Sequence, residues 1–147
     1  MISVSQKSQY ALRGVFELAK RGGRSAAISE LAVAQAIPRR FLEVIFGELR
    51  KAGLVKTFRG PEGGYVLARP ACEITAGEIL RLVEGPTDLV KCVSAGDHCP
   101  FVKTCPFRDM WDEAGQAMDA VFYRTTIQEL VDKHLASRTA PTPNYNI

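Results

Sequence analysis

The sequence has little of what a membrane-bound or secreted protein requires. None of its apolar runs approaches the roughly 18 residues that a membrane-spanning helix needs. Met1 leads straight into a polar segment, without the charged and apolar regions of a secretory signal. We therefore expect a cytoplasmic protein that does not enter a membrane and whose thiols stay reduced.

The residue sets of common enzymes are also missing. Histidine occurs only twice, as His98 and His134, so histidine-based acid–base chemistry is poorly supplied. There is no Ser/His/Asp set, no phosphate-binding glycine loop and no carboxylate pair placed for catalysis. A chain of 147 residues fits one domain, or one domain with an appended element. We do not expect an enzyme.

Charge is distributed unevenly between the two halves of the chain. Residues 1–69 carry 12 Lys and Arg against 5 Asp and Glu, a net charge of +7. Residues 70–147 carry 7 against 11, a net charge of −4. The basic half is expected to contact a polyanion, and nucleic acid is the candidate.

Hydrophobic periodicity in the basic half predicts a helix, a short helix, a third helix and a hairpin. Helical patterns cover residues 5–21, 29–36 and 38–53, and two short strands, 54–58 and 65–68, flank the turn RGPEGG. This order is typical of a winged helix-turn-helix. The predicted fold class is therefore mainly α with a small β-hairpin wing, and residues 1–70 would form a DNA-binding domain.

Such a domain places its third helix in the major groove and its hairpin on the backbone or in the minor groove. Arginine pairs with guanine or phosphate, and glutamate accepts from cytosine. Ser29, the expected N-cap of the second helix, would mark a phosphate site. Arg59 at the wing tip would enter a narrow minor groove. The predicted DNA contacts are Ser29, Arg39, Arg40, Glu43, Arg50, Lys51, Lys56 and Arg59.

The second half, residues 71–136, predicts a connecting helix over 75–85 and one long helix from about Pro106 to Ala136. Thr75 would cap the first of these helices. The long helix would have nothing in its own chain to pack along its full length, so we expect a homodimer through Phe107–Ala136; the alternative is a helix folded back on its own domain. Residues 137–147 are expected to form a disordered tail. The long helix has apolar positions in heptad steps at Phe107, Trp111, Ala114, Met118, Val121 and Thr125.

Between these helices, the loop 91–106 holds Cys92, Cys99 and Cys105 in a C-x6-C-x5-C pattern. The short C-x2-C pairs of structural zinc sites are absent. Three clustered cysteines in a reducing compartment favour a metal site or redox chemistry over a disulfide. The spacing leaves open an iron–sulfur cluster, a zinc site and redox thiols without metal. Cys72, outside the loop, is interpreted as a small buried hydrophobic residue.

Several stretches resemble the IscR/NsrR family of winged-helix transcription regulators over roughly residues 1–136. They are QYALRGVFELA (9–19), FLEVIFGELRKAGLVKTFRGPEGGYVLAR (41–69), ITAGEILRLVEG (74–85), the three-cysteine loop and TIQELV (126–131). The resemblance implies a homodimer on a palindromic operator and a 2Fe–2S or 4Fe–4S cluster. The cluster would sense redox state, nitric oxide, iron or cluster supply. Cys92, Cys99 and Cys105 correspond to its ligands, Glu43 to a base-reading residue and Arg59 to the wing arginine.

Two departures from the family pattern leave the fourth ligand open. The first cysteine gap is six residues where five is familiar, and Arg108 stands where IscR-type members hold a histidine. The candidates are His98, Asp97, Asp109, a residue of the partner chain or an exogenous ligand. We expect a cluster-switched regulator, a repressor by preference. The alternatives are a thiol- or zinc-switched regulator and, from another class, an iron–sulfur electron carrier or enzyme subunit, against which the basic wing argues.

Overall fold

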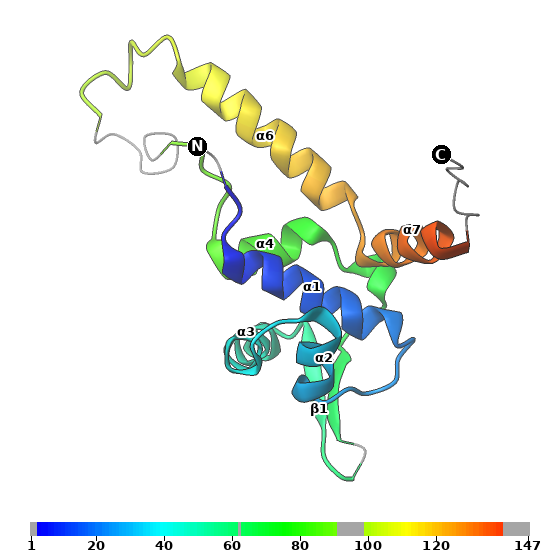
Figure 1. Cartoon of the computed structure of the whole chain (residues 1–147). Helices are drawn as coiled ribbons and strands as arrows, with labels where there is room; N and C mark the ends of the chain where they lie inside the picture. The colour runs from blue at the N-terminus through cyan, green and yellow to red at the C-terminus, as the bar shows by residue number, and fades with distance from the viewer. Residues whose placement is uncertain (1–2, 62, 91–98, 140–147) are drawn as a thin grey trace, which may run out of the picture.

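A computed structural model describes residues 3–61, 63–90 and 99–139 of the chain. The predicted fold class, mainly helical with a two-strand wing, is confirmed. Figure 1 shows the wing projecting from one end of the helical body, while α6 extends from the other. The elements are α1 (Gln6–Lys20), α2 (Ile28–Gln35), α3 (Arg39–Lys51), β1 (Val55–Phe58), β2 (Gly64–Leu67), the short 3-10 helix η1 (Ala71–Glu73), α4 (Ala76–Glu84), α6 (Arg108–Arg124) and α7 (Ile127–Thr139).

The apolar stripe of α3 is buried against α1. Leu42, Ile45, Phe46 and Leu49 are each at most 1% exposed. Gly14 of α1 lies against Phe46, and a Cβ at Gly14 would come within 2.7 Å of the Phe46 ring. Because an aromatic side chain fills that space, the two helices can approach closely only where α1 lacks a side chain. The opposite face of α3 is thereby turned to solvent.

The wing is fastened to the helical body at its base. β1 and β2 are antiparallel, with Val55 opposite Leu67. Tyr65 of β2 also exchanges two backbone hydrogen bonds with Ala26, of 3.0 and 2.8 Å. A Cβ at Gly64 would lie 2.5 Å from the Ala26 backbone, so only glycine permits this contact. The segment just before α2 thus acts as a third strand position and fixes the wing relative to α2.

Two predicted helix caps have different outcomes. Thr75 caps α4 as predicted, since its hydroxyl accepts a hydrogen bond from the Glu78 N–H at 3.1 Å. Ser29 as the N-cap of α2 is wrong, because the helix begins one residue earlier and Ala27 occupies the cap. Ala27 has no side-chain acceptor, and the Glu30 carboxylate accepts its N–H at 2.8 Å instead. Ser29 lies exposed in the first turn.

The predicted single long helix is wrong, because the chain forms two helices that part at Thr125. That residue is extended, with φ −87° and ψ 108°. Thr126 and Glu129 then start α7 with a reciprocal capping box of 3.1 and 3.0 Å hydrogen bonds. Backbone hydrogen bonds of 2.9 Å from Ala76 to Thr125 and from Ile127 to Ile74 hold the break in place.

The two C-terminal helices take different positions. Ile127 and Val131 of α7 are buried, and the His134 ring meets the Phe16 ring of α1 edge-on at 5.5 Å. α7 therefore folds back on the domain, which is the alternative that the sequence left open. α7 continues to Thr139, so the expected disordered tail does not begin at residue 137. Residues 140–147 of that tail lie outside the described residues.

The other helix, α6, is far less covered. Gly115 is the one buried residue along it. Near its end, the Tyr123 ring lies against Gly77 of α4, where a Cβ would come within 2.7 Å of the ring. This contact anchors α6 to α4 and leaves much of the helix surface exposed (Figure 1). Among the described residues, no helix has both the length and the apolar character to cross a membrane.

Candidate nucleic-acid interface

The exposed face of α3 carries most of the predicted DNA contacts. Five of them, Arg39, Arg40, Glu43, Arg50 and Lys51, lie on this helix, and all five are exposed. Since the apolar stripe of α3 is buried against α1, these charged side chains have to face outward. The structure therefore brings them together on one surface, as the helical spacing predicted.

One pair on this face is already engaged. The Arg39 Nε donates to the Glu43 Oε1 at 2.8 Å, with the two side chains 68% and 48% exposed. An ion pair this exposed contributes little to stability. Either partner can therefore exchange it for a nucleic-acid group at small cost, and the pairing holds Glu43 on the outer surface of α3.

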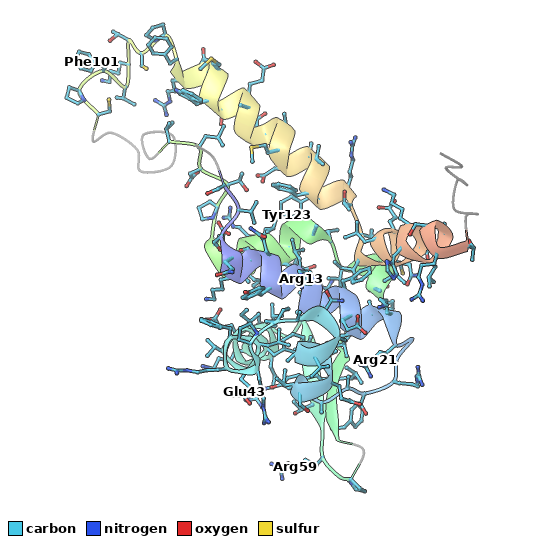
Figure 2. All side chains as sticks on the ribbon, in the orientation of Figure 1. Arg13, Arg21, Glu43, Arg59, Phe101 and Tyr123 are labelled. Carbon is cyan, nitrogen blue, oxygen red and sulfur yellow. The ribbon has the colours of Figure 1, made fainter. Side chains whose placement is uncertain are left out.

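The wing and α2 supply the remaining predicted contacts. Lys56 on β1 and Arg59 just beyond it are exposed. Figure 2 shows Arg59 near the tip of the wing and Glu43 on the side of α3. The turn after Arg59 uses Gly60 at φ 127°, a conformation that favours glycine. Ser29 joins this set as an exposed residue of α2, although not as a helix cap.

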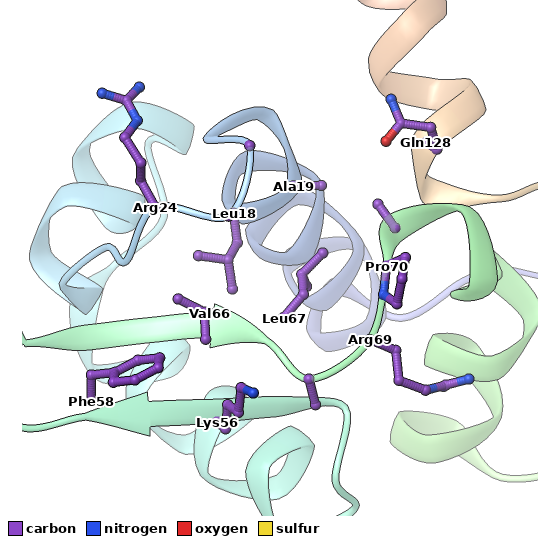
Figure 3. A pocket seen from close by; sticks show the side chains of 14 residues that line it. Leu18, Ala19, Arg24, Lys56, Phe58, Val66, Leu67, Arg69, Pro70 and Gln128 are labelled. Carbon is purple, nitrogen blue, oxygen red and sulfur yellow. The ribbon is translucent and has the colours of Figure 1, made fainter.

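A groove of about 490 Å³ lies behind the wing, between the hairpin, the end of α1, η1 and the start of α7. Apolar residues such as Leu18, Val66 and Pro70 line it, and Figure 3 shows the basic residues Arg24, Lys56 and Arg69 pointing in different directions at its edges. Arg69 is also paired with the Glu78 carboxylate. Because these cations do not converge, the groove is not built to hold one small anion.

The cysteine loop is described only in part. Cys92 lies outside the described residues, together with the candidate ligands Asp97 and His98. Cys99 and Cys105 carry free thiols and are half-buried. The Val102 N–H donates to the Cys99 carbonyl at 3.0 Å, so a turn separates the two thiols. Within residues 3–61, 63–90 and 99–139, no group of three His, Cys, Asp or Glu side chains could hold a metal ion.

Arg108 and Cys72 also bear on the sequence predictions. The Arg108 guanidinium donates to the Val102 carbonyl at 3.4 Å, which ties the start of α6 to the loop. Cys72 was interpreted as buried, and this is wrong because η1 places it at the surface. Of the three residues of η1, only Ala71 packs against the core, and it is half-buried, whereas Cys72 is exposed.

Glu17, which no sequence pattern singled out as functional, is a buried carboxylate that joins α1 to α2. Glu17 is 7% exposed, and its Oε2 accepts from Lys20 Nζ at 2.9 Å and from Gln35 Nε2 at 2.8 Å. Burial raises its pKa, but hydrogen bonds from Lys20 and Gln35 and the charges of Lys20 and Arg21 outweigh this, and the pKa is lowered overall. Lys20 and Arg21 at i+3 and i+4 were the available signal.

A three-helix body, an exposed charged third helix and a basic hairpin wing define a winged helix-turn-helix DNA-binding protein. The chain belongs to the Rrf2 family of transcriptional regulators: the profile of that family, described as an iron-dependent transcriptional regulator, matches residues 4–133. The expectation that the protein is not an enzyme is confirmed by this membership.

Individual relatives are similar to this chain in sequence and in structure. An HTH-type transcriptional regulator of Mycobacterium tuberculosis is 36% identical over 93% of this chain and 86% of its own length. CymR of Bacillus subtilis is 35% identical over 88% of this chain and 89% of its own. The solved structure of B. subtilis CymR, titled the global cysteine regulator, has a TM-score of 0.75 at 33% identity, covering 90% and 98%. T. potens IscR has a TM-score of 0.79 at 27% identity, covering 98% and 96%.

Glu17→Gln should lower the free energy of unfolding at pH 7 by about 1–2 kcal/mol, because a charge-assisted hydrogen-bond network loses its charge. Because the pKa of Glu17 is lower in the folded chain than its ordinary value of 4.5, the carboxylate stabilises the native state at pH values above 4.5. This contribution to stability is lost as the pH falls through the pKa of the folded state. The difference between wild type and variant in urea unfolding should therefore narrow below pH 4.5. Glu48→Gln, which removes an ion pair with Lys7 that is 43% exposed on both sides, is the control and should change little. A difference that stays constant with pH would contradict this role for Glu17.

Proposed function

We propose that this protein is a dimeric repressor that binds a palindromic operator through α3 and the wing, and whose operator affinity is switched by an iron–sulfur cluster. The observation that carries the proposal is the position of the three-cysteine loop. It connects α4, which packs on α1 of the DNA-binding body, to α6, the helix whose surface is left largely exposed. A change in this loop acts on the junction between the two.

DNA binding follows from the exposed residues of α3 and the wing. In this proposal α3 enters the major groove, where Glu43 contacts base edges and Arg39, Arg40, Arg50 and Lys51 contact bases or phosphates. Lys56 and Ser29 contact the backbone from the wing and from α2. Arg59 reaches from the wing tip into the minor groove.

Arg59→Ala should weaken operator binding by about 1–3 kcal/mol and reduce the slope of log affinity against log salt by about one, because a cation held in the negative potential of the minor groove is lost. The measurement is a salt titration of binding to an operator selected from random duplexes. Arg138→Ala, which removes an exposed cation from α7, is the matched control and should leave both quantities unchanged. Equal effects of the two substitutions would contradict the wing assignment.

The proposed dimer uses the part of the heptad seam that its own chain leaves exposed. Phe107 and Val121 are 59% and 46% exposed, and the half-buried Ala114 lies midway between them at a spacing of seven residues. Trp111 and Met118, on the adjacent edge of the same stripe, are half-buried against their own chain. A second copy would cover the exposed row, and the resulting two-fold symmetry matches a palindromic operator.

Val121→Glu should convert the dimer to a monomer in sedimentation experiments, because it places a charge inside the apolar contact. Gln116→Glu adds the same charge to the opposite, solvent-facing side of α6 and should leave the dimer intact. Dissociation by both substitutions, or by neither, would contradict an interface along Phe107, Ala114 and Val121.

The described part of the loop fits a thiolate-bound cluster. Cys99 and Cys105 are free and half-buried, and a backbone turn lies between them. Cys92, Cys99 and Cys105 would hold the group, with the fourth ligand among Asp97, His98, Asp109, a partner residue or an exogenous ligand. A 2Fe–2S or 4Fe–4S cluster supplies a centre whose charge and integrity respond to redox state, nitric oxide and iron supply. Cys92 and Cys99 would then fix the path of the loop between α4 and α6.

The switch requires two dimer geometries with different operator affinities. Arg108 already ties the first turn of α6 to the loop through Val102, so the loop conformation bears on the direction of α6. Operator half-sites one helical turn apart tolerate little change in the separation of the two wings and recognition helices. The dimer with a group bound in its loops and the dimer without one should therefore differ in affinity for the same operator.

A cluster-free switch is the second candidate. A solved structure of Staphylococcus aureus CymR, with a TM-score of 0.70 at 30% identity, is titled as an oxidised form. Cys99 and Cys105 are free thiols close in sequence, as thiol oxidation or zinc binding would also require. In this version of the proposal the same loop changes conformation through thiol chemistry.

Protein purified without oxygen should absorb broadly near about 400 nm and contain iron and sulfide in similar amounts, because thiolate-bound iron–sulfur clusters have charge-transfer bands in this region. Cys105→Ser should lose the band and most of the iron. Cys72→Ser, at the exposed cysteine outside the loop, is the control and should keep both. A wild-type protein that remains colourless after reconstitution with iron and sulfide would contradict the cluster and favour the thiol or zinc switch.

A further inference from the structure

One row of residues along the exposed face of α3 is uncharged in its middle, although its two ends are basic. Positions 40, 44, 47 and 51 follow one another in steps of four and three along the side of the helix opposite the buried stripe. Arg40 and Lys51 are the ends of this row, and Val44 and Gly47 form its middle. Val44 is 57% exposed. The row thus has a flat, apolar centre between two cations.

Nothing in the described part of the chain requires a glycine at position 47. Glycine inside a helix is destabilising relative to alanine. Crowding explains Gly14 and Gly77, where a Cβ would come within 2.7 Å of a neighbouring ring, but a Cβ at Gly47 would meet nothing within 4 Å. Gly47 also has no positive φ, because it lies in a regular helical turn. The space above it is therefore available to something outside the chain.

The charges around Gly47 indicate what that partner is. Arg40 and Lys51 are 11 residues apart, which corresponds to about 16 Å along a helix. That separation is enough to reach phosphates on both sides of a major groove about 12 Å wide. Anionic walls on both sides and a helix lying between them describe the major groove of duplex DNA. The apolar group on the floor of this groove is the C5-methyl of thymine.

We propose that Gly47 lets the α3 backbone approach the floor of the major groove, and that Val44 reads the methyl group of a thymine in each operator half-site. The inference rests on the proposed function, because it requires α3 to bind DNA. It adds an apolar specificity contact to the charged residues already assigned. It also gives a reason for a helix glycine that costs stability.

Gly47→Ala separates these roles, because its effects on stability and binding should have opposite signs. The added methyl group should raise the melting temperature by about 2–4 °C, since alanine favours the helix. The same group should weaken operator binding about tenfold or more, since it holds the backbone away from the base pairs. A variant that is more stable and binds the operator with wild-type affinity would overturn the role of Gly47.

Replacing single operator thymines by deoxyuridine tests Val44, because the exchange removes only the C5-methyl. Wild-type protein should lose about fourfold in affinity at one thymine of each half-site, the value for one buried apolar carbon. Val44→Ala should bind the thymine operator more weakly and show no further loss at that position. Val33→Ala, at a valine of α2 that is 83% exposed, is the matched control and should keep the wild-type methyl sensitivity.

The outcomes distinguish this inference from the proposed function. Selection from random duplexes that yields no operator would remove the DNA-binding function, and the inference with it. If Arg59→Ala weakens binding to the selected operator but no deoxyuridine replacement changes the affinity, the proposed function stands and the inference alone is overturned. A methyl sensitivity that survives unchanged in Val44→Ala would also overturn the inference alone.

Discussion

The close packing of α1 against α3 at Gly14 is the contact on which the recognition surface depends. The Phe46 ring occupies the space where a side chain at position 14 would lie, and a Cβ there would come within 2.7 Å of it. Since interiors are packed as densely as crystals, this contact leaves α3 little freedom to rotate. The rotation of α3 in turn decides which of its residues face solvent. This one buried aromatic contact thus helps to set which charged residues of the helix face solvent.

α1 also supports the parts of the chain that lie away from α3. Glu17 bonds to Gln35 at the end of α2, and Phe16 meets His134 of α7 edge-on. The backbone N–H of Ser5, at the start of α1, donates to the Glu84 carboxylate of α4 at 2.8 Å. α1 therefore contacts α3 on one side and the elements that lead to the cysteine loop on the other. This shared support gives the proposed switch a contiguous physical connection to the proposed DNA-binding face.

The break between α6 and α7 divides the C-terminal segment into two tasks. Thr126 and Glu129 restart the helix, and the backbone around Thr125 pairs with the residues that begin α4. α7 can then return to the domain core and contribute Ile127 to it. α6 is left to extend beyond the body, with Tyr123 against Gly77 as its anchor. A single continuous helix has one direction, so it could not both pack on the domain core, as α7 does, and extend beyond the body, as α6 does.

The sequence by itself determined the helix order, the wing, the charged face of α3 and the family, because these depend on local periodicity, turn residues and motifs. It also located the cysteine loop, although part of that loop lies outside the described residues. Only the tertiary structure decided that the last helix breaks at Thr125, that Ala27 rather than Ser29 caps α2, and that Cys72 is exposed. Those outcomes depend on backbone pairing and packing between residues far apart in the chain, such as Ile74 with Ile127, and periodicity carries no information about such contacts. The bonds of Glu17 belong to the same group, since its partner Gln35 comes within reach only once α2 has docked on α1.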